Sequence, residues 1–266
     1  MLTIRQTQMD VLERAATLAF EDRTYAHLKE YFPGHCHLLG EKQMRRVIRY
    51  GWEKSKSYGF TAECCVRMYI EFMCLLGGGF DTDPLLPWAA EILKESPSAD
   101  QVARGDRFYA RAWEYIEHII PDYRDASGTP NTARFAAELK QLRTMPDESL
   151  GPHNLPVFDH ALQARLRQVF PAKCNNIGTE HVQLLVRTAI GTGAGYGITG
   201  TRGITLIATL MFVLGSGFER DPLLPWIAPT LKDRSIRTPT KRVDKLYLKA
   251  LGVLGNWWDF AHQTGT

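Results

Sequence analysis

The sequence has no apolar run long enough to cross a bilayer. Its longest, Gly203 to Gly217, falls short of the ~20 residues that a membrane-spanning helix needs. The first residues, Met1 to Met9, contain no apolar core of a signal peptide. The five cysteines are an odd number and include no CxxC pair, so no disulfide framework is indicated. We therefore expect a cytoplasmic protein with reduced thiols.

The sequence also lacks a strong charge of one sign. The formal net charge is +3 and the pI is near 8.6, too mild a balance to predict nucleic-acid binding. Basic residues do gather at two places: Lys42, Arg45, Arg46 and Arg49, and Arg234, Arg237, Lys241 and Arg242. Solvated helix faces account for both groups. No nucleic-acid partner and no membrane span are expected.

Alternating Val- and Thr-rich segments, the signature of strands, are absent. Apolar residues instead recur at helical spacing, for example over residues 4–31. The expected fold class is therefore all-α. In the first part of the chain we expect helices at 4–31, 40–59, 61–76, 83–93 and 99–120. Phe32-Pro33-Gly34 is predicted to end the first, and Thr61 to cap the third.

An internal repeat dominates the sequence. FDTDPLLPW at 80–88 returns as FERDPLLPW at 218–226, an offset of 138 residues. The same offset, without a gap, gives 25 identities over the 76 positions from 20 to 95. Average residue usage would give about 5. The pattern predicts a tandem duplication of an approximately five-helix unit into two pseudo-symmetric helical halves.

The repeat sets the expected domain organisation. Unit 1 covers residues 1–125 and unit 2 covers residues 139–266. Between them, residues 126–138 form a linker leading into a helix, since the stretch at 125–132, DASGTPNT, is typical of a loop.

The DPLLPW motif is the most specific local signal, because it occurs twice. We expect Asp83 to cap a helix whose first position is Pro84, with the leucines and tryptophan filling the core. The residues of this structural motif are Asp83, Pro84, Leu85, Leu86, Trp88, Asp221, Pro222, Leu223, Leu224 and Trp226. A docking surface for a partner is the alternative reading.

No catalytic, metal or cofactor residue can be assigned. His35-Cys36-His37 resembles a metal cluster, but the second copy reads Lys173-Cys174-Asn175, and only a buried-type cysteine persists. Gly191 to Gly197 is glycine-rich but has no preceding strand and no Walker lysine. We interpret it as a helix end where small residues let another backbone approach. Neither GxSxG nor HExxH occurs.

The two copies differ in polarity. The second and third helices of unit 1 carry charges such as Glu53, Lys54 and Glu71, where unit 2 has small or hydroxyl residues. Loss of charge is typical of an interface, although a face buried inside the protein would show it too. The candidate partner-binding residues are Gly193, Gly195, Thr201, Thr205 and Thr209.

The sequence resembles a family of small bacterial all-helical accessory proteins. The likeness rests on IRQxQM (Ile4 to Met9), the FP and YG pairs, and DPLLPWA, and it is best over Ile4 to Leu93. This family is encoded in type VI secretion effector clusters, near PAAR and spike proteins and their adaptor chaperones. The resemblance carries no catalytic residues.

The resemblance implies a non-catalytic protein-binding role: a chaperone, co-chaperone or adaptor for a type VI secretion effector. The expected partner is that effector, a PAAR or spike protein, or an adaptor chaperone. An immunity protein that neutralises a cognate toxin is one alternative. An enzyme or toxin with a site in the cleft between the repeats is the other.

Overall fold

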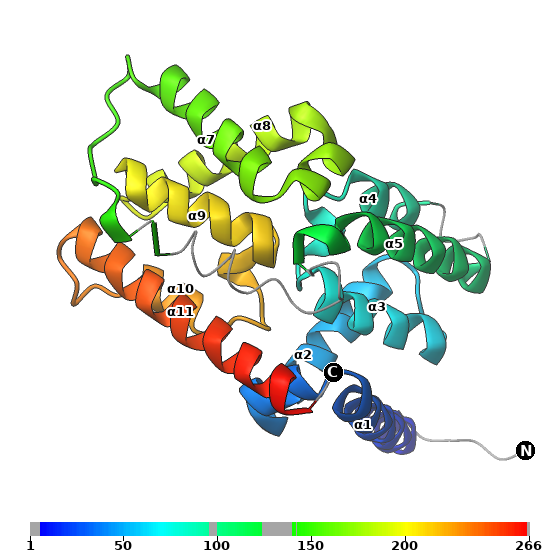
Figure 1. Ribbon diagram of the computed structural model, residues 1–266. Helices are drawn as coiled ribbons and strands as arrows, with labels where there is room; N and C mark the ends of the chain where they lie inside the picture. The colour runs from blue at the N-terminus through cyan, green and yellow to red at the C-terminus, as the bar shows by residue number, and fades with distance from the viewer. Residues whose placement is uncertain (1–5, 96–99, 124–139, 142, 265–266) are drawn as a thin grey trace, which may run out of the picture.

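The fold is all-α. The computed structural model describes residues 6–95, 100–123, 140–141 and 143–264 (Figure 1). In this part of the chain there are ten named α-helices, two 3₁₀ helices and no strand, apart from one isolated bridge between Ser149 and Gly200. None of the described helices combines the length and apolarity that crossing a membrane requires. The predicted linker and the first five residues lie outside the described residues.

The helices of the first half are α1 (Gln6–Tyr31), α2 (Pro33–Ser57), α3 (Glu63–Leu76), η1 (Phe80–Thr82), α4 (Pro87–Leu93) and α5 (Gln101–Tyr123). Those of the second half are α7 (Leu155–Val169), α8 (Pro171–Gly195), α9 (Thr201–Leu214), η2 (Phe218–Arg220), α10 (Ile227–Leu231) and α11 (Pro239–Thr264). The bounds of α2, α3 and η1 recur 138 residues later, in α8, α9 and η2. Among the described residues each half thus contains five named α-helices, and the tandem duplication itself stays a prediction.

Three predicted helix starts are wrong. The second helix begins at Pro33, not Gly40, because proline fits the first helical position; Gly40 instead forms a kink with φ 68°. Thr61 does not cap α3, whose N-cap residue is Ala62. The helix expected at Asp83 begins only at Pro87, after a 3₁₀ turn that ends at Asp83.

One helix of each half also packs against the other half. Besides packing in its own half, α5 packs against α8 of the other half, and α11 packs against α2 (Figure 1). Asp122, near the end of α5, accepts hydrogen bonds from the backbone N–H groups of Ala172 (3.1 Å) and Lys173 (2.7 Å). A carboxylate at a helix N-terminus satisfies unpaired donors and the helix dipole. The first half therefore supplies the N-terminal cap of α8.

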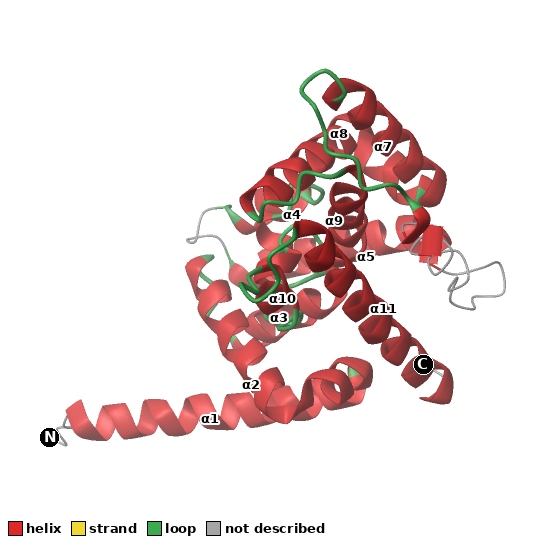
Figure 2. Ribbon diagram, turned by 90° about the vertical axis from the view of Figure 1, so that its left-hand side faces the viewer, coloured by secondary structure: helices red, strands yellow, loops and turns green. Residues whose placement is uncertain are grey.

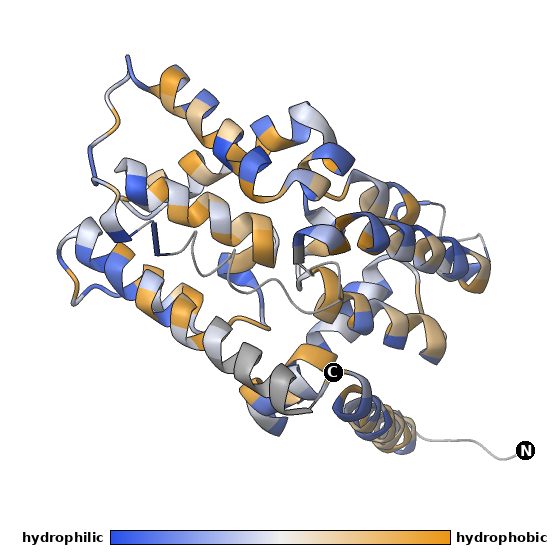
Figure 3. Ribbon diagram, viewed as in Figure 1, coloured by the Kyte–Doolittle hydropathy of each residue, from blue (hydrophilic) through white to orange (hydrophobic). Residues whose placement is uncertain are grey.

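The halves are unequal in their apolar content. Helix α9 is buried from Gly203 to Phe212 and is mostly orange in Figure 3. Its counterpart α3 keeps Arg67 and Glu71 partly exposed.

Candidate functional site

The junction between the halves is built on the two aspartates of the DPLLPW motif. Asp221 Oδ2 accepts a hydrogen bond from Gly78 N at 2.7 Å, and Asp83 Oδ2 accepts one from Ser216 N at 2.8 Å. Gly78 and Ser216 are 138 residues apart, as are Asp83 and Asp221, so the two bonds are reciprocal. Reciprocal contacts are the mark of a two-fold, isologous interface. The motif therefore joins the halves to each other.

The same aspartates also order their own turns. The second oxygen of Asp83 accepts Leu85 N at 2.8 Å, and that of Asp221 accepts Leu223 N at 2.7 Å. This arrangement corrects the expected role, because neither carboxylate caps a helix of its own half. The leucines of both motifs are buried as expected, and so is Trp88, whereas Trp226 is only partly buried.

Glycines let the two backbones meet at this junction. A Cβ on Gly77 would lie 2.6 Å from the carbonyl oxygen of Leu214, and one on Gly215 would lie 3.4 Å from that of Leu76. Both glycines have positive φ, 97° and 96°. Gly79 and Gly217 face each other directly, each Cβ position being within 3.9 Å of the other's Cα. The backbones of the two halves therefore meet at two glycine loops, residues 77–79 and 215–217.

A buried amine and a buried imidazole flank the junction at equivalent positions. Lys173 Nζ donates to the carbonyl oxygen of Phe212, near the end of α9, and burial lowers the pKa of Lys173 to about 8. Burial likewise lowers the pKa of His35 to about 4, and a bond to the backbone of Cys74 opposes this shift. A cation stabilises a helix C-terminus, so the Lys173 ammonium has a structural role at the end of α9, whereas the His35 imidazole at the equivalent position is neutral near pH 7.

Two cavities open along the junction. The polar one, of about 490 Å³, is lined by Tyr50, Lys54, Gly78, Gly79, Asp81, Thr82, Gly217, Arg220 and Asp221. Asp81 is 1% exposed, and its Oδ2 accepts the Tyr58 hydroxyl at 2.9 Å and lies 3.5 Å from Lys54 Nζ, so the carboxylate is held in the wall of the cavity. The apolar one, of about 240 Å³, lies against α3 and α5 and has Asp83 and Lys173 in its wall. Neither contains a nucleophile hydrogen-bonded to a base.

The candidate partner-binding residues of the second half are corrected by their burial. Gly193, Thr205 and Thr209 are buried, and both hydroxyls donate to carbonyl oxygens of their own helix. Only Gly195 is exposed; Thr201 is half-buried and donates to the carbonyl oxygen of Pro146. The lost charges of this half therefore mark an internal face, the alternative that the sequence left open.

The glycine-rich segment has the packing role expected of it. Gly191, Gly193 and Gly195 lie in the last turns of α8. A Cβ on Gly193 would lie 2.6 Å from the carbonyl oxygen of Ile198, so the following backbone folds back against the helix. Nothing in this geometry resembles a phosphate-binding loop after a strand.

An exposed apolar face on α1 was missed by the sequence reading. In the C-terminal part of the helix Phe20 and Leu28 face the core. Towards the N-terminus Val11 (66% exposed) and Leu18 (59%) lie on the opposite side, as a spacing of 100° per residue requires. Leu12 is also exposed, 58%, about 100° around the helix from Val11. The sequence contained a signal for these exposed residues, because the apolar positions move from one side of the helix to another along its length.

This N-terminal part of α1, residues 6–16, is called the arm here. Figure 2 shows it running out beyond the other helices. Helix α7 has no such extension, since it begins at Leu155, the counterpart of Thr17. Residues 145–154, at the positions equivalent to 7–16, form turns and an extended segment instead. The arm is therefore a feature of the first half alone.

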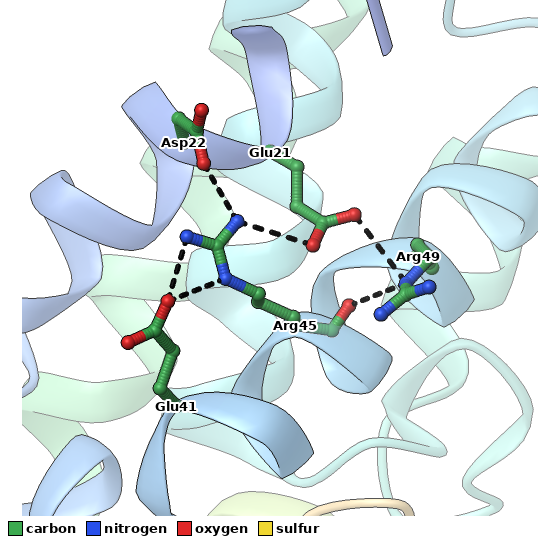
Figure 4. Close-up of polar contacts among 5 residues, drawn as sticks. All are labelled: Glu21, Asp22, Glu41, Arg45 and Arg49. Atoms are coloured by element: carbon green, nitrogen blue, oxygen red, sulfur yellow. Dashed lines mark hydrogen bonds and ion pairs between the residues drawn. The ribbon is translucent and has the colours of Figure 1, made fainter. Parts of the chain in front are cut away.

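An ion cluster holds the base of the arm on α2 (Figure 4). Arg45 donates to Asp22 at 2.7 Å, to Glu21 at 3.2 Å and to Glu41 at 2.8 Å. Arg49 pairs with the second oxygen of Glu21 at 3.3 Å. The pKa of Arg45 is raised by these three carboxylates, led by Asp22. One of the basic clusters expected to be merely solvated thus orients α1 through Arg45.

A second exposed apolar surface runs along α5. Val102, Tyr109, Trp113 and Ile120 are 38–48% exposed at spacings of seven, four and seven residues, and Leu75 of α3 lies alongside the apolar cavity. We call this the α5 stripe. At the equivalent of Tyr109, which is 48% exposed, Tyr247 is 4% exposed. Contiguous exposed apolar surface is typical of sites that bind another protein.

Three comparisons with known proteins found no match: no family model, no curated protein and no solved structure is significantly similar to this chain.

Proposed function

We propose that this chain is a non-catalytic, protein-binding accessory protein, a chaperone or adaptor that holds a type VI secretion effector. The arm is the observation that supports this proposal most directly. A helix with large apolar residues in water, such as Val11 and Leu12, gains stability by burying them against another surface.

The α5 stripe gives the partner a second contact on the same half. Aromatic anchors such as Tyr109 and Trp113 dominate the binding energy of protein interfaces. The remaining cavities support catalysis less well, because their carboxylates already accept backbone or tyrosine hydrogen bonds. The proposed contacts are therefore protein surfaces, and all of them lie in the first half.

The test is co-expression of the tagged chain with the product of each flanking gene, followed by affinity capture and gel filtration. We expect one stable complex, and we expect the double variant Val11→Asp, Leu12→Asp to weaken it at least about tenfold, since two exposed anchors of the arm would be lost. Val157→Asp is the matched control, since Val157 is a 71% exposed apolar residue on α7. A complex that tolerates the double variant as well as it tolerates Val157→Asp would contradict the role of the arm.

The same complex separates the accessory role from that of an immunity protein. A chaperone or adaptor leaves the activity of the folded effector intact, whereas an immunity protein abolishes it at a one-to-one ratio. Failure to recover any flanking gene product, together with turnover of a small substrate in the junction cavities, would favour the enzyme alternative.

A further inference from the structure

Three sulfur atoms of the first half gather around one small cavity. Cys64 and Cys65 are in the first turn of α3, and their Sγ atoms are 3.8 Å apart. Met68 follows one turn later on the same helix face. All three residues line a cavity of about 220 Å³ between α3 and α5. The cavity also borders Val102 and Tyr109 of the α5 stripe, but the sulfur atoms are not among the residues of the proposed protein-binding surface.

Gly105 of α5 leaves room for the sulfurs to approach one another. A Cβ at this position would lie 3.5 Å from Met68 Sδ and 3.6 Å from Cys65 Sγ. The two sulfurs are therefore within about 7 Å of each other across an open space. Methionine has three rotatable side-chain bonds, so its thioether can swing into such a gap.

The spacing of the two thiols fits a shared metal ion. With a metal–sulfur bond of about 2.3 Å, a separation of 3.8 Å corresponds to a sulfur–metal–sulfur angle of about 111°. That angle suits trigonal or tetrahedral binding, whereas a linear site would need about 4.6 Å. A disulfide is the poorer alternative, because adjacent Cα atoms are about 3.8 Å apart, below the range of about 4.4–6.8 Å found across disulfides.

The identity of the third ligand decides the class of metal. Within the described residues no three His, Cys, Asp or Glu side chains are close enough to hold an ion, so a zinc site would lack ligands. A thioether completes a set of soft ligands, which select Cu(I). We propose that Cys64, Cys65 and Met68 bind one Cu(I) ion as two thiolates and a thioether. Binding releases the two thiol protons and involves no redox step.

The second half shows how the same position looks without the cluster. The counterparts of the three residues are Arg202, Gly203 and Leu206, and the counterpart of Gly105 is Val243. Arg202 forms an ion pair with Asp244 there, bridging α9 and α11. The sulfur atoms are therefore not required by the fold at this position.

The test uses the full chain, reduced and anaerobic, titrated with Cu(I) against a chromophoric Cu(I) chelator. We expect one tightly bound ion per chain, with X-ray absorption showing only sulfur ligands at about 2.3 Å. Outer-shell changes cost metal sites about 10- to 100-fold in affinity, so Cys65→Ser should cost more. Met68→Leu, the residue of the second half, should weaken binding and remove one sulfur from the spectrum.

Two further variants guard against misfolding and adventitious thiol binding. Gly105→Ala fits its surroundings in the apo protein and favours the helix, yet fills the space between the sulfurs, so it should also weaken binding. Cys174→Ala removes a buried cysteine elsewhere and should leave the affinity unchanged. Equal Cu(I) affinity in Cys65→Ser and the parent, nitrogen or oxygen ligands in the spectrum, or Zn(II) binding as tight as Cu(I) would each overturn the proposal.

Discussion

Replacing Gly77 by alanine tests whether the glycine loops hold the two halves together. Gly40, Gly77 and Gly215 share one backbone region, with φ between 68° and 97° and ψ between 150° and 162°. An alanine in this region costs about 1–3 kcal/mol of strain at any of them. The two sites differ in the space available for the alanine Cβ. At Gly40 no atom lies within 4 Å of it, whereas at Gly77 the carbonyl oxygen of Leu214 would be 2.6 Å away.

The contact at Gly77 cannot be relieved by a side-chain rotation, because the clashing atom belongs to the backbone. Overpacking costs about 1–3 kcal/mol. If the halves part to relieve it, the bonds from Gly78 N to Asp221 and from Ser216 N to Asp83 weaken. Hydrogen bonds to charged groups contribute about 1.5–3 kcal/mol each. We therefore expect Gly77→Ala to cost about 2–5 kcal/mol more than Gly40→Ala, a large part of a typical stability of 5–15 kcal/mol.

The assay is urea unfolding at 25 °C followed by tryptophan fluorescence and circular dichroism. Coincident transitions by the two probes justify a single free energy of unfolding. Gly215→Ala, whose Cβ would stand 3.4 Å from its nearest neighbours, should fall between the other two variants. Native-state hydrogen exchange adds a local readout, since the amides of Gly78 and Ser216 should lose protection in Gly77→Ala. Equal costs for Gly77→Ala and Gly40→Ala, to within about 0.5 kcal/mol, would refute the reasoning.

Three further predictions concern buried charged groups. Burial raises the folded-state pKa of Asp221 from 3.8 to about 6. Its contribution to the free energy of unfolding is therefore fully present below pH 3.8 and is lost as the pH rises through 6. Unfolding measured as a function of pH should show a loss of about 3 kcal/mol in the parent and no such loss in Asp221→Asn. Burial lowers the pKa of Lys173 from 10.5 to about 8, so the parent should gain about 3 kcal/mol between pH 8 and 10.5, and Lys173→Met should not. Arg104 is fully buried and donates to the carbonyl oxygens of Glu95 and Tyr58. Arg104→Lys should leave one of these carbonyls unpaired and lower the free energy of unfolding in urea by about 1–3 kcal/mol. An unchanged midpoint of unfolding would contradict this.

The helices were predictable because their signals are local. Periodic apolar residues predicted α1, and the helix end predicted at 76, just before Gly77, is where α3 ends. The first residues of the helices were harder to predict, because a proline both disfavours helix at the residue before it and favours the start of a new helix. Pro33 was assigned to a loop for the first reason and begins α2 for the second.

The junction was not predictable in the same way, because its partners are 133 and 143 residues apart along the chain. An aspartate followed by proline has a familiar local use as a helix cap, and that use was assigned to Asp83 and Asp221. Nothing in one sequence distinguishes it from a carboxylate that reaches another half. The repeat pointed to the importance of the motif without revealing that its two copies bind each other's loops.

The contrast between equivalent positions shows that the first half leaves residues exposed that the second half buries. Tyr109 and Tyr247 are the same residue type 138 positions apart, yet one is half exposed and the other buried. Thr205 and Thr209 are likewise buried where Arg67 and Glu71 reach the solvent. The polarity difference that first suggested an interface in the second half therefore has the opposite meaning. These positions of the second half carry no charge because the fold covers them, whereas their counterparts in the first half reach the solvent.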